Sequence, residues 1–205
     1  MTGRDKMKLT RRETLKLALT GMALPLMAGA SAARAANRIE PEMTEDGLYR
    51  QEWFLDSFLE LADDLQTATD NGKRFAIFWE LKGCPYCKKM HTANLSDPTI
   101  NSFIADNFDV LQLNLIGDRR VTDFDGSEMS EKQLAAKYGV RFTPTIQFFD
   151  TDPEPLATTP ARDREINRLV GYVEPRQFTA QFRFITEEAY KNQSFRQFWQ
   201  AQQKS

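Results

Sequence analysis

The sequence is poor in the residues that bind metals. Its 205 residues include only two cysteines and one histidine. A structural zinc site usually takes four Cys or His ligands, so these three residues cannot form one alone. The hydrophobic fraction of 41% and the 15 phenylalanines indicate a globular protein with a full core, and argue against a disordered chain.

Long hydrophobic runs are also absent. The best candidate, residues 17–30, is interrupted by a glycine and a proline and is too short for a stable membrane anchor. Residues 1–16 before it are rich in lysine and arginine, and residues 33–35 after it read ARA. A basic start, a short apolar middle and an A-x-A end predict a secretory signal peptide over residues 1–35, with cleavage after Ala35.

The basic part of this leader indicates an export route. Residues 10–16 read TRRETLK, which resembles the twin-arginine motif S/T-R-R-x-F-L-K with Thr14 in place of Phe. Adjacent arginines also occur in general secretory signals, so both routes stay open. Either route crosses the bacterial inner membrane, and we expect a periplasmic protein.

Positive charge is scarce once the leader is removed. The leader holds seven of the 27 basic and two of the 29 acidic residues, so 20 and 27 remain and the net charge is −7. An acidic chain is a poor partner for nucleic acid or an anionic membrane surface, and we expect neither.

The hydrophobic pattern predicts the order α-β-α-β-α-β-β-α. Strands that alternate with helices and end in a hairpin predict an α/β fold, with a mixed central sheet flanked by helices on both faces. Residues 36–48 are polar and are expected to be a flexible lead-in to one domain over residues 49–205. Expected helices are 49–69, 88–92, 98–107, 130–138 and 174–192; expected strands are 74–79, 108–115, 145–149 and 168–170; expected loops are 116–128 and 151–164.

Both cysteines and the histidine lie in residues 79–91, WELKGCPYCKKMH. Cys84 follows an expected strand and a short loop, and Pro85 suits the first turn of a helix. A thiol there faces the positive end of the helix, which stabilises thiolate over thiol. Cys87 lies one turn later. These positions predict that Cys84 attacks a substrate disulfide and that Cys87 resolves the resulting mixed disulfide.

Two other interpretations of the pair remain. A fixed structural disulfide is one, although it would close only a tiny loop and stabilise little. A copper carrier that uses Cys84, Cys87 and His91 is the other, because soft ligands suit Cu(I). His91 is four residues after Cys87, so both can share one helix face.

A second motif, Thr143-Pro144, stands directly before the expected strand 145–149. Proline cannot donate to a sheet ladder, so it belongs at the start of a strand. A cis Thr143–Pro144 bond would make a tight turn and leave the Thr143 backbone free to pair with an extended substrate.

Together these features resemble the thioredoxin superfamily. The resemblance rests on CPYC after a strand, on KYGVRFTPT before another strand, and on the order of elements, and it covers about residues 50–190. It is closer to the periplasmic thioredoxin-like branch, near the SoxW-type thioredoxins of bacterial sulfur-oxidation systems and the disulfide isomerases. The family implies an attacking Cys84, a resolving Cys87, and a cis Pro144 preceded by a substrate-contacting Thr143.

The chain departs from the thioredoxin pattern at several positions. Gly83 stands where thioredoxins have Trp, and the dipeptide between the cysteines is Pro-Tyr. The buried Asp of thioredoxins aligns with Ile77, so the usual proton acceptor is missing. Glu80, expected in the loop, is a possible substitute. Tyr86 is expected to contact substrate, and an apolar collar of Trp79, Tyr86 and Phe142 around the thiols is a further expectation.

The resemblance implies an exported protein-disulfide oxidoreductase, in the direction of a reductase, whose redox-active disulfide serves in place of any cofactor. A strongly oxidising relative has His between its cysteines, whereas Tyr86 carries no charge. An oxidase or isomerase remains the alternative, although isomerases usually add a dimerisation domain and residues 36–48 are too few for one. Implied partners are a disulfide-bearing periplasmic client and a membrane electron donor of the CcdA or DsbD kind. We expect a monomer.

Overall fold

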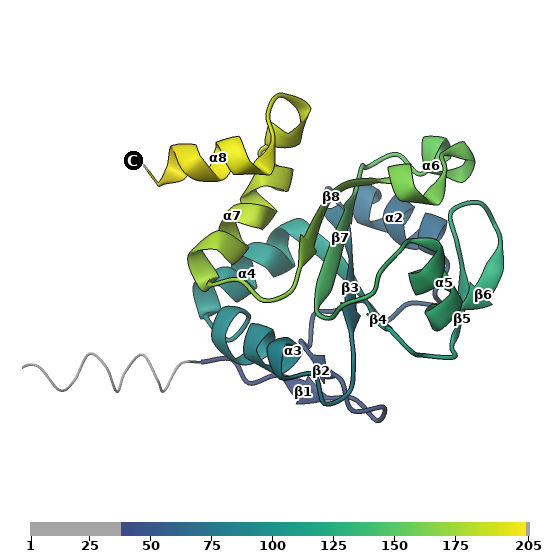
Figure 1. Ribbon diagram of the computed structural model, residues 1–205, viewed down its shortest axis with the longest axis horizontal. Coiled ribbons are helices and arrows are strands. Elements are labelled where there is room, and N and C mark those ends of the chain that lie inside the picture. Colours follow the sequence, from purple (N-terminus) through teal and green to yellow (C-terminus); the bar gives the residue numbers. More distant parts are fainter. Residues whose placement is uncertain (1–37, 204–205) are drawn as a thin grey trace, which may run out of the picture. The chain divides into compact units, whose positions relative to one another are not determined.

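A computed structural model describes residues 38–203 (Figure 1). The predicted signal peptide, residues 1–35, lies outside the described residues. Four strands form the central sheet in the order β4-β3-β7-β8. They are β3 (Arg74–Glu80), β4 (Phe108–Asn114), β7 (Thr145–Phe149) and β8 (Glu165–Val170). β3 runs parallel to β4 and antiparallel to β7, which pairs antiparallel with β8, so the sheet is mixed as predicted.

Both faces of the sheet are buried. Side chains alternate between the two faces of a strand, and successive β3 residues accordingly belong to two separate hydrophobic clusters. Phe78 packs in one cluster with Phe182 of α7 (Pro175–Thr186), whereas Trp79 packs in the other with Leu65 of α2 (Leu61–Asp70). Figure 1 shows α4 (Pro98–Asn107) and α7 on one side of the sheet and α2 and α5 (Glu131–Lys137) on the other. The predicted fold class is therefore confirmed.

The helices surround this sheet. They are α2 (Leu61–Asp70), α3 (Pro85–Lys89), α4 (Pro98–Asn107), α5 (Glu131–Lys137), α6 (Glu154–Thr158), α7 (Pro175–Thr186) and α8 (Phe195–Gln202). The α3 helix continues as a π-helical turn, Met90–Asn94, and short 3₁₀ turns occupy Ala161–Asp163 and Ala189–Lys191. The predicted helix 98–107 is confirmed at both ends. Its start is fixed by Asp97, whose side chain caps the first turn by accepting from two backbone N–H groups. None of the helices within residues 38–203 has the length and apolar character to cross a membrane.

The predicted helix 49–69 is wrong in its first half. The helix begins at Leu61, and Phe58, which lies within the predicted range, is 96% exposed. Leu59 has a positive φ of 65°, which a helix does not allow. The Arg50 guanidinium donates to the carbonyls of Phe54 and Leu55, and thereby satisfies backbone groups that a helix would have paired internally.

Short elements account for the other differences. The expected loop 116–128 contributes to a hairpin of β5 (Arg120–Thr122) and β6 (Glu128–Ser130), and the lead-in contributes to a hairpin of β1 (Glu42–Met43) and β2 (Tyr49–Arg50). Strands of two or three residues are too short to be recognised from the alternation of apolar and polar residues. The expected loop 151–164 contains α6. The expected helix 174–192 stops at Thr186, because Glu188 is left-handed with φ 52°.

Candidate functional site

The first element of the site is the turn that leads from β3 to Cys84. Gly83 adopts a φ of 76°, a left-handed conformation that glycine takes without steric cost. The Cys84 N–H closes this turn by donating to the Leu81 carbonyl at 3.1 Å. A bulky residue at position 83 would be strained, so local geometry explains the glycine in this chain.

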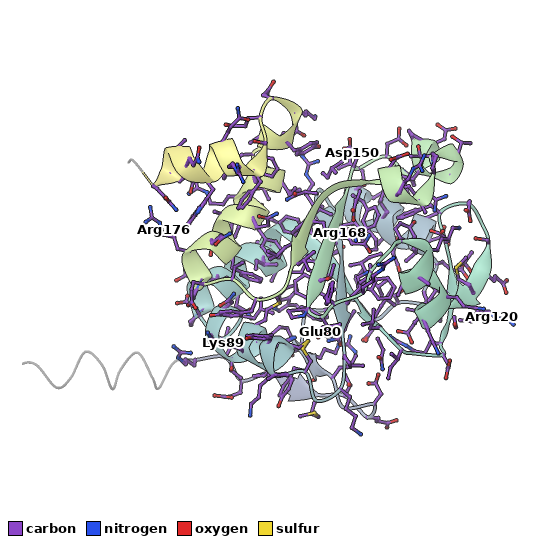
Figure 2. The ribbon with its side chains drawn as sticks, viewed as in Figure 1. Glu80, Lys89, Arg120, Asp150, Arg168 and Arg176 are labelled. Atoms are coloured by element: carbon purple, nitrogen blue, oxygen red, sulfur yellow. A yellow bond between two sulfur atoms is a disulfide. The ribbon has the colours of Figure 1, made fainter. Side chains whose placement is uncertain are left out.

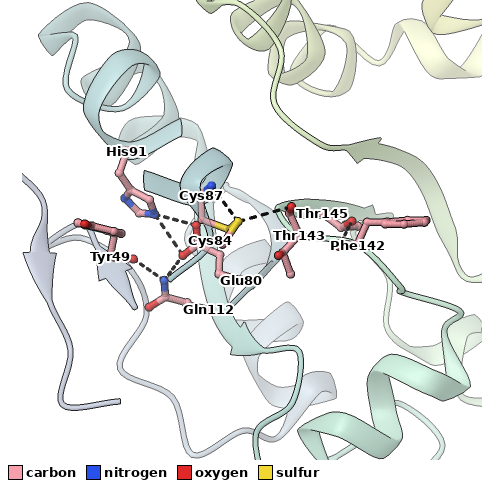
Figure 3. The surroundings of a disulfide bond; sticks show 9 residues. All are labelled: Tyr49, Glu80, Cys84, Cys87, His91, Gln112, Phe142, Thr143 and Thr145. Carbon is pink, nitrogen blue, oxygen red and sulfur yellow. Dashed lines mark hydrogen bonds and ion pairs between the residues drawn. A yellow bond between two sulfur atoms is a disulfide. The ribbon is translucent and has the colours of Figure 1, made fainter. Parts of the chain in front are cut away.

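The two cysteines form a disulfide at the start of α3 (Figure 3). The Cys84 side chain caps the helix, since its Sγ accepts from the Cys87 backbone N–H at 3.1 Å, and Pro85 is the first helical residue, as expected. Cys84 is partly exposed, whereas Cys87 is only 2% exposed. A large partner can therefore reach one sulfur and not the other.

The Thr143-Pro144 motif lies against this disulfide. The peptide bond between the two residues is cis, as expected. The Thr143 carbonyl oxygen is 3.6 Å from Cys84 Sγ, although the two residues are far apart in sequence. The Thr145 hydroxyl donates to the Phe142 carbonyl at 2.8 Å, and the Gly171 N–H donates to the Pro144 carbonyl at 2.7 Å. Two hydrogen bonds thus hold the turn that carries Thr143.

Two of the three expected collar aromatics are on the surface. Tyr86 is 59% exposed and Phe142 is 67% exposed. Trp79 is fully buried, and its indole N–H donates to Gln147 Oε1 at 2.5 Å, so its expected place in the collar is wrong. Tyr86 lies on α3 between the two cysteines, and Phe142 directly precedes Thr143, with its side chain extending away from the disulfide in Figure 3.

Glu80 is not in the loop. It is the last residue of β3 and only 1% exposed. In Figure 2 it lies inside the molecule near α3, whereas Arg120 lies at the periphery. Glu80 and Ile77 are three residues apart on one strand, so they face opposite sides of the sheet. The Glu80 carboxylate accepts from the Gln112 side-chain amide and contacts His91 Nε2 at 2.9 Å (Figure 3).

His91 is fully buried with both ring nitrogens engaged. Nε2 faces Glu80, and Nδ1 lies 3.0 Å from Gln51 Nε2. Within the part of the chain that the structure describes, no three His, Cys, Asp or Glu side chains form a group that could hold a metal. The ring therefore joins, by hydrogen bonds, a buried polar layer under α3 that consists of Gln51, Glu80, His91 and Gln112.

Sequence reasoning missed the two glutamines of this layer. Gln112 stands in the middle of the otherwise apolar stretch FDVLQLN of β4 and is only 8% exposed, and Gln51 is 1% exposed. An amide at a buried position of an apolar strand must find hydrogen-bond partners. That signal was present in the sequence for Gln112, whereas Gln51 lies in an irregular segment and gives none.

A charged pair borders the site on the side of β8. Lys89 Nζ lies 4.0 Å from the centroid of the Tyr172 ring and 3.4 Å from a Glu174 carboxylate oxygen. Desolvation and the Glu174 carboxylate both raise the pKa of Tyr172 above its ordinary value. These contacts link α3 to the segment that follows β8.

The family model of the thioredoxin-like domain matches residues 61–186, more than half of the chain. Among solved structures, a thioredoxin-fold protein from Helicobacter pylori is 24% identical, covers 65% of this chain and 83% of its own, and has a TM-score of 0.47. A thioredoxin from Thermus thermophilus is 23% identical, with coverage of 60% and 82% and a TM-score of 0.45. The C-terminal domain of Neisseria meningitidis DsbD in the oxidised form is 16% identical, with coverage of 60% and 90% and a TM-score of 0.42.

The comparison with curated proteins gives no match. The family model spans the segment from α2 to the end of α7, which includes the four central strands, both cysteines and the Thr143-Pro144 turn. This protein belongs to the thioredoxin-like domain family.

Proposed function

We propose that this protein is an exported thiol–disulfide oxidoreductase that reduces disulfides of periplasmic proteins with the Cys84–Cys87 dithiol. The observation that carries the proposal is the unequal exposure of two bonded sulfurs beside a backbone carbonyl. Cys84 is partly exposed and 3.6 Å from the Thr143 carbonyl oxygen, whereas Cys87 is buried. An attacking and a resolving thiol need this difference in access.

The reaction proceeds in two exchanges. The Cys84 thiolate attacks one sulfur of the client disulfide, forms a mixed disulfide, and releases the other client sulfur as a thiolate that takes a proton from solvent. Cys87 then loses its proton and attacks the Cys84 sulfur. This step forms the Cys84–Cys87 disulfide and releases the second client thiolate. The client gains two electrons and two protons, and the protein is oxidised.

The turn before β7 positions the client. The Thr143 backbone is in place to pair with an extended client segment. The exposed rings of Tyr86, between the cysteines, and of Phe142, directly before Thr143, offer apolar contacts to it. Substrate recognition of this kind depends on backbone and shape, which suits several client sequences.

Glu80 is the proton acceptor for Cys87 in this proposal. Cys87 and His91 both lie on the buried side of the α3 helix and its π-helical extension, and His91 contacts Glu80 directly. The carboxylate therefore lies in the layer beneath the resolving thiol. It supplies from β3 the base that thioredoxins place at the position of Ile77.

The reduction potential of the Cys84–Cys87 pair tests the direction of electron flow. Because uncharged Tyr86 does not favour the thiolate, we expect a value nearer to thioredoxin at about −270 mV than to DsbA at about −120 mV. Equilibration with glutathione buffers, followed by quantification of the free thiols, gives the potential. A value near the DsbA end would replace the reductase by an oxidase on the same site.

Export and recharging complete the proposal. A periplasmic reductase needs electrons from the cytosol. The resemblance to the SoxW-type branch suggests a membrane protein of the CcdA or DsbD kind as their source.

The TRRETLK leader supports the twin-arginine route. Replacing both Arg11 and Arg12 by Lys should therefore leave the precursor in the cytoplasm. Cell fractionation measures this, and unchanged export would assign the leader to the general secretory route.

A further inference from the structure

A continuous chain of buried hydrogen bonds links Trp53 to Glu80. The Trp53 indole N–H donates to Asn101 Oδ1 at 3.0 Å, and Asn101 Nδ2 donates to Gln51 Oε1 at 2.9 Å. Gln51 Nε2 lies 3.0 Å from His91 Nδ1, and His91 Nε2 lies 2.9 Å from Glu80 Oε1. The four residues after Trp53 are all less than 10% exposed, so solvent does not compete for these contacts.

The Trp53 end of this series of hydrogen bonds determines which group donates and which accepts in each of them. The Trp53 indole nitrogen is a donor only, so the atom of Asn101 that faces it must be the oxygen. Asn101 Nδ2 also donates to the Leu95 carbonyl at 2.8 Å, and a carbonyl is an acceptor only. With Asn101 fixed by both partners, its amide presents an N–H to Gln51. Gln51 must then turn its oxygen to Asn101 and its NH₂ group to His91.

This orientation determines the state of the imidazole. The Gln51 NH₂ group needs an acceptor, so Nδ1 of His91 carries no proton, and the ring proton lies on Nε2 and points at Glu80. We infer that Gln51 holds His91 as a neutral Nε2–H donor, and that both are positioning residues which keep Glu80 an available base for Cys87. The inference rests on the proposed function.

The charge balance around Glu80 supports this assignment. The other buried carboxylates of the described chain each have a Lys or Arg partner: Asp109 with Lys73, Asp123 with Arg164, and Glu131 with Arg119. Glu80 has instead two neutral donors, His91 and the Gln112 amide. Neutral donors orient the carboxylate without the Coulomb attraction that a cation adds to its charged form.

Among residues 38–203, Glu80 is the one charged side chain that forms a hydrogen bond or ion pair with the His91 ring. Besides Glu80 from β3, the groups that face it are the phenol ring of Tyr49 from β2, with centroids 6.0 Å apart, and the ring of Phe54, at 5.8 Å. Both are ring contacts, and the hydrogen-bond partner of Nδ1 is Gln51, so Gln51 decides whether Nδ1 can be protonated.

Nitrogen NMR of the ring tests the inference directly. His91 is the only histidine, so its ring signals need no assignment by mutagenesis. At pH 6, where a free imidazole is mostly charged, we expect the wild-type ring to be neutral with its proton on Nε2. A charged ring, or a proton on Nδ1, would overturn the inference. This measurement requires no variant to fold.

The variant Gln51→Glu replaces the donor that faces His91 Nδ1 by an acceptor, with little change in side-chain shape. A carboxylate still accepts from Asn101, but it presents an acceptor to Nδ1 in place of a donor. We expect a doubly protonated ring at pH 6. Resolution of the Cys84 mixed disulfide by Cys87 should slow roughly tenfold, which is less than the about 10²–10⁴-fold that a general base contributes, because Glu80 itself stays in place. The first exchange, capture of a peptide disulfide by Cys84, should change less than twofold.

The matched control is Gln193→Glu, which adds the same charge at an exposed position and should alter neither the ring signals nor the rates. If the ring is charged in Gln51→Glu and Cys87 still resolves the mixed disulfide at the wild-type rate, the hydrogen bond from Gln51 to His91 has no role in catalysis and the inference is overturned. If the wild-type protein reduces no peptide disulfide at all, the proposed function fails, and the state of the wild-type ring still decides whether Gln51 holds His91 neutral.

Discussion

Cys84→Ser is expected to abolish reduction of a peptide disulfide, whereas Cys87→Ser should accumulate mixed disulfides with it. The reason is the difference in access to the two sulfurs. Cys84 is partly exposed beside the Thr143 carbonyl, so the client can be attacked only there. Cys87 is 2% exposed and can attack only a sulfur already joined to Cys84. Without Cys87 nothing resolves the intermediate.

Turnover of a peptide disulfide and mass spectrometry of the trapped adduct measure both outcomes. The chain has no third cysteine, so each variant keeps one thiol and iodoacetamide reports its access. The thiol of Cys87→Ser should be alkylated much faster than that of Cys84→Ser. Normal turnover by Cys84→Ser, or a peptide trapped on Cys87, would reverse the two roles.

The elements that carry the site were predictable because their signals are local. Within the strand 74–79, residues 75–79 (FAIFW) are an unbroken apolar run, and CPYC after a short loop of four residues places Cys84 at a helix start. The strand 145–149 was predicted with its observed bounds, and a proline directly before a strand predicted the turn. Local signals therefore predicted each half of the site, whereas the resemblance to the thioredoxin superfamily implied that the thiols and Thr143 contact the same substrate.

The layer under α3 was not predictable in the same way. Glu80 was assigned to the loop because an acidic residue at the end of an apolar strand is usually solvated. Its burial depends on His91 and Gln112, which come from two other elements, and the orientation of His91 depends on a residue as remote as Trp53. Such a network forms only in the folded protein, between residues that are far apart in the sequence. No short stretch of sequence therefore contains a pattern that predicts it.

A second group of buried charges surrounds Asp123, in the turn between β5 and β6. Arg164, 4% exposed, donates to Asp123 at 2.7 Å and to the Tyr138 hydroxyl at 2.9 Å, and its Nε donates to the Thr159 carbonyl at 2.8 Å. Lys137 also contacts Asp123. These bonds tie the segment before β8 to the end of α5 and to the turn of the β5–β6 hairpin.

Arg164→Ala is expected to lower the free energy of unfolding by about 3–5 kcal/mol, the usual cost of removing one partner of a buried ion pair. Lys137 remains beside Asp123, so the lower end of this range is the expectation. Chemical denaturation measures the loss. The control is Arg162→Ala, two residues away, whose side chain is 84% exposed and whose loss should cost less than about 0.5 kcal/mol. Similar losses in both variants would contradict the assignment.

The pH dependence separates charge from packing in this cluster. Although desolvation raises it, hydrogen bonds from Lys137, Ser127 and Arg164 hold the pKa of Asp125 well below its ordinary value. A carboxylate with a lowered pKa contributes stability that is fully present above its unfolded pKa of about 3.9 and is lost progressively as the pH falls from there through the much lower folded pKa. Removing Arg164 should raise the folded pKa of Asp125, so the stability gap between wild type and Arg164→Ala should be widest at neutral pH and narrow steadily as the pH falls below about 4. A gap that stays constant from pH 7 to pH 2 would mean that Arg164 acts through packing and its bond to the Thr159 carbonyl, and not through its charge.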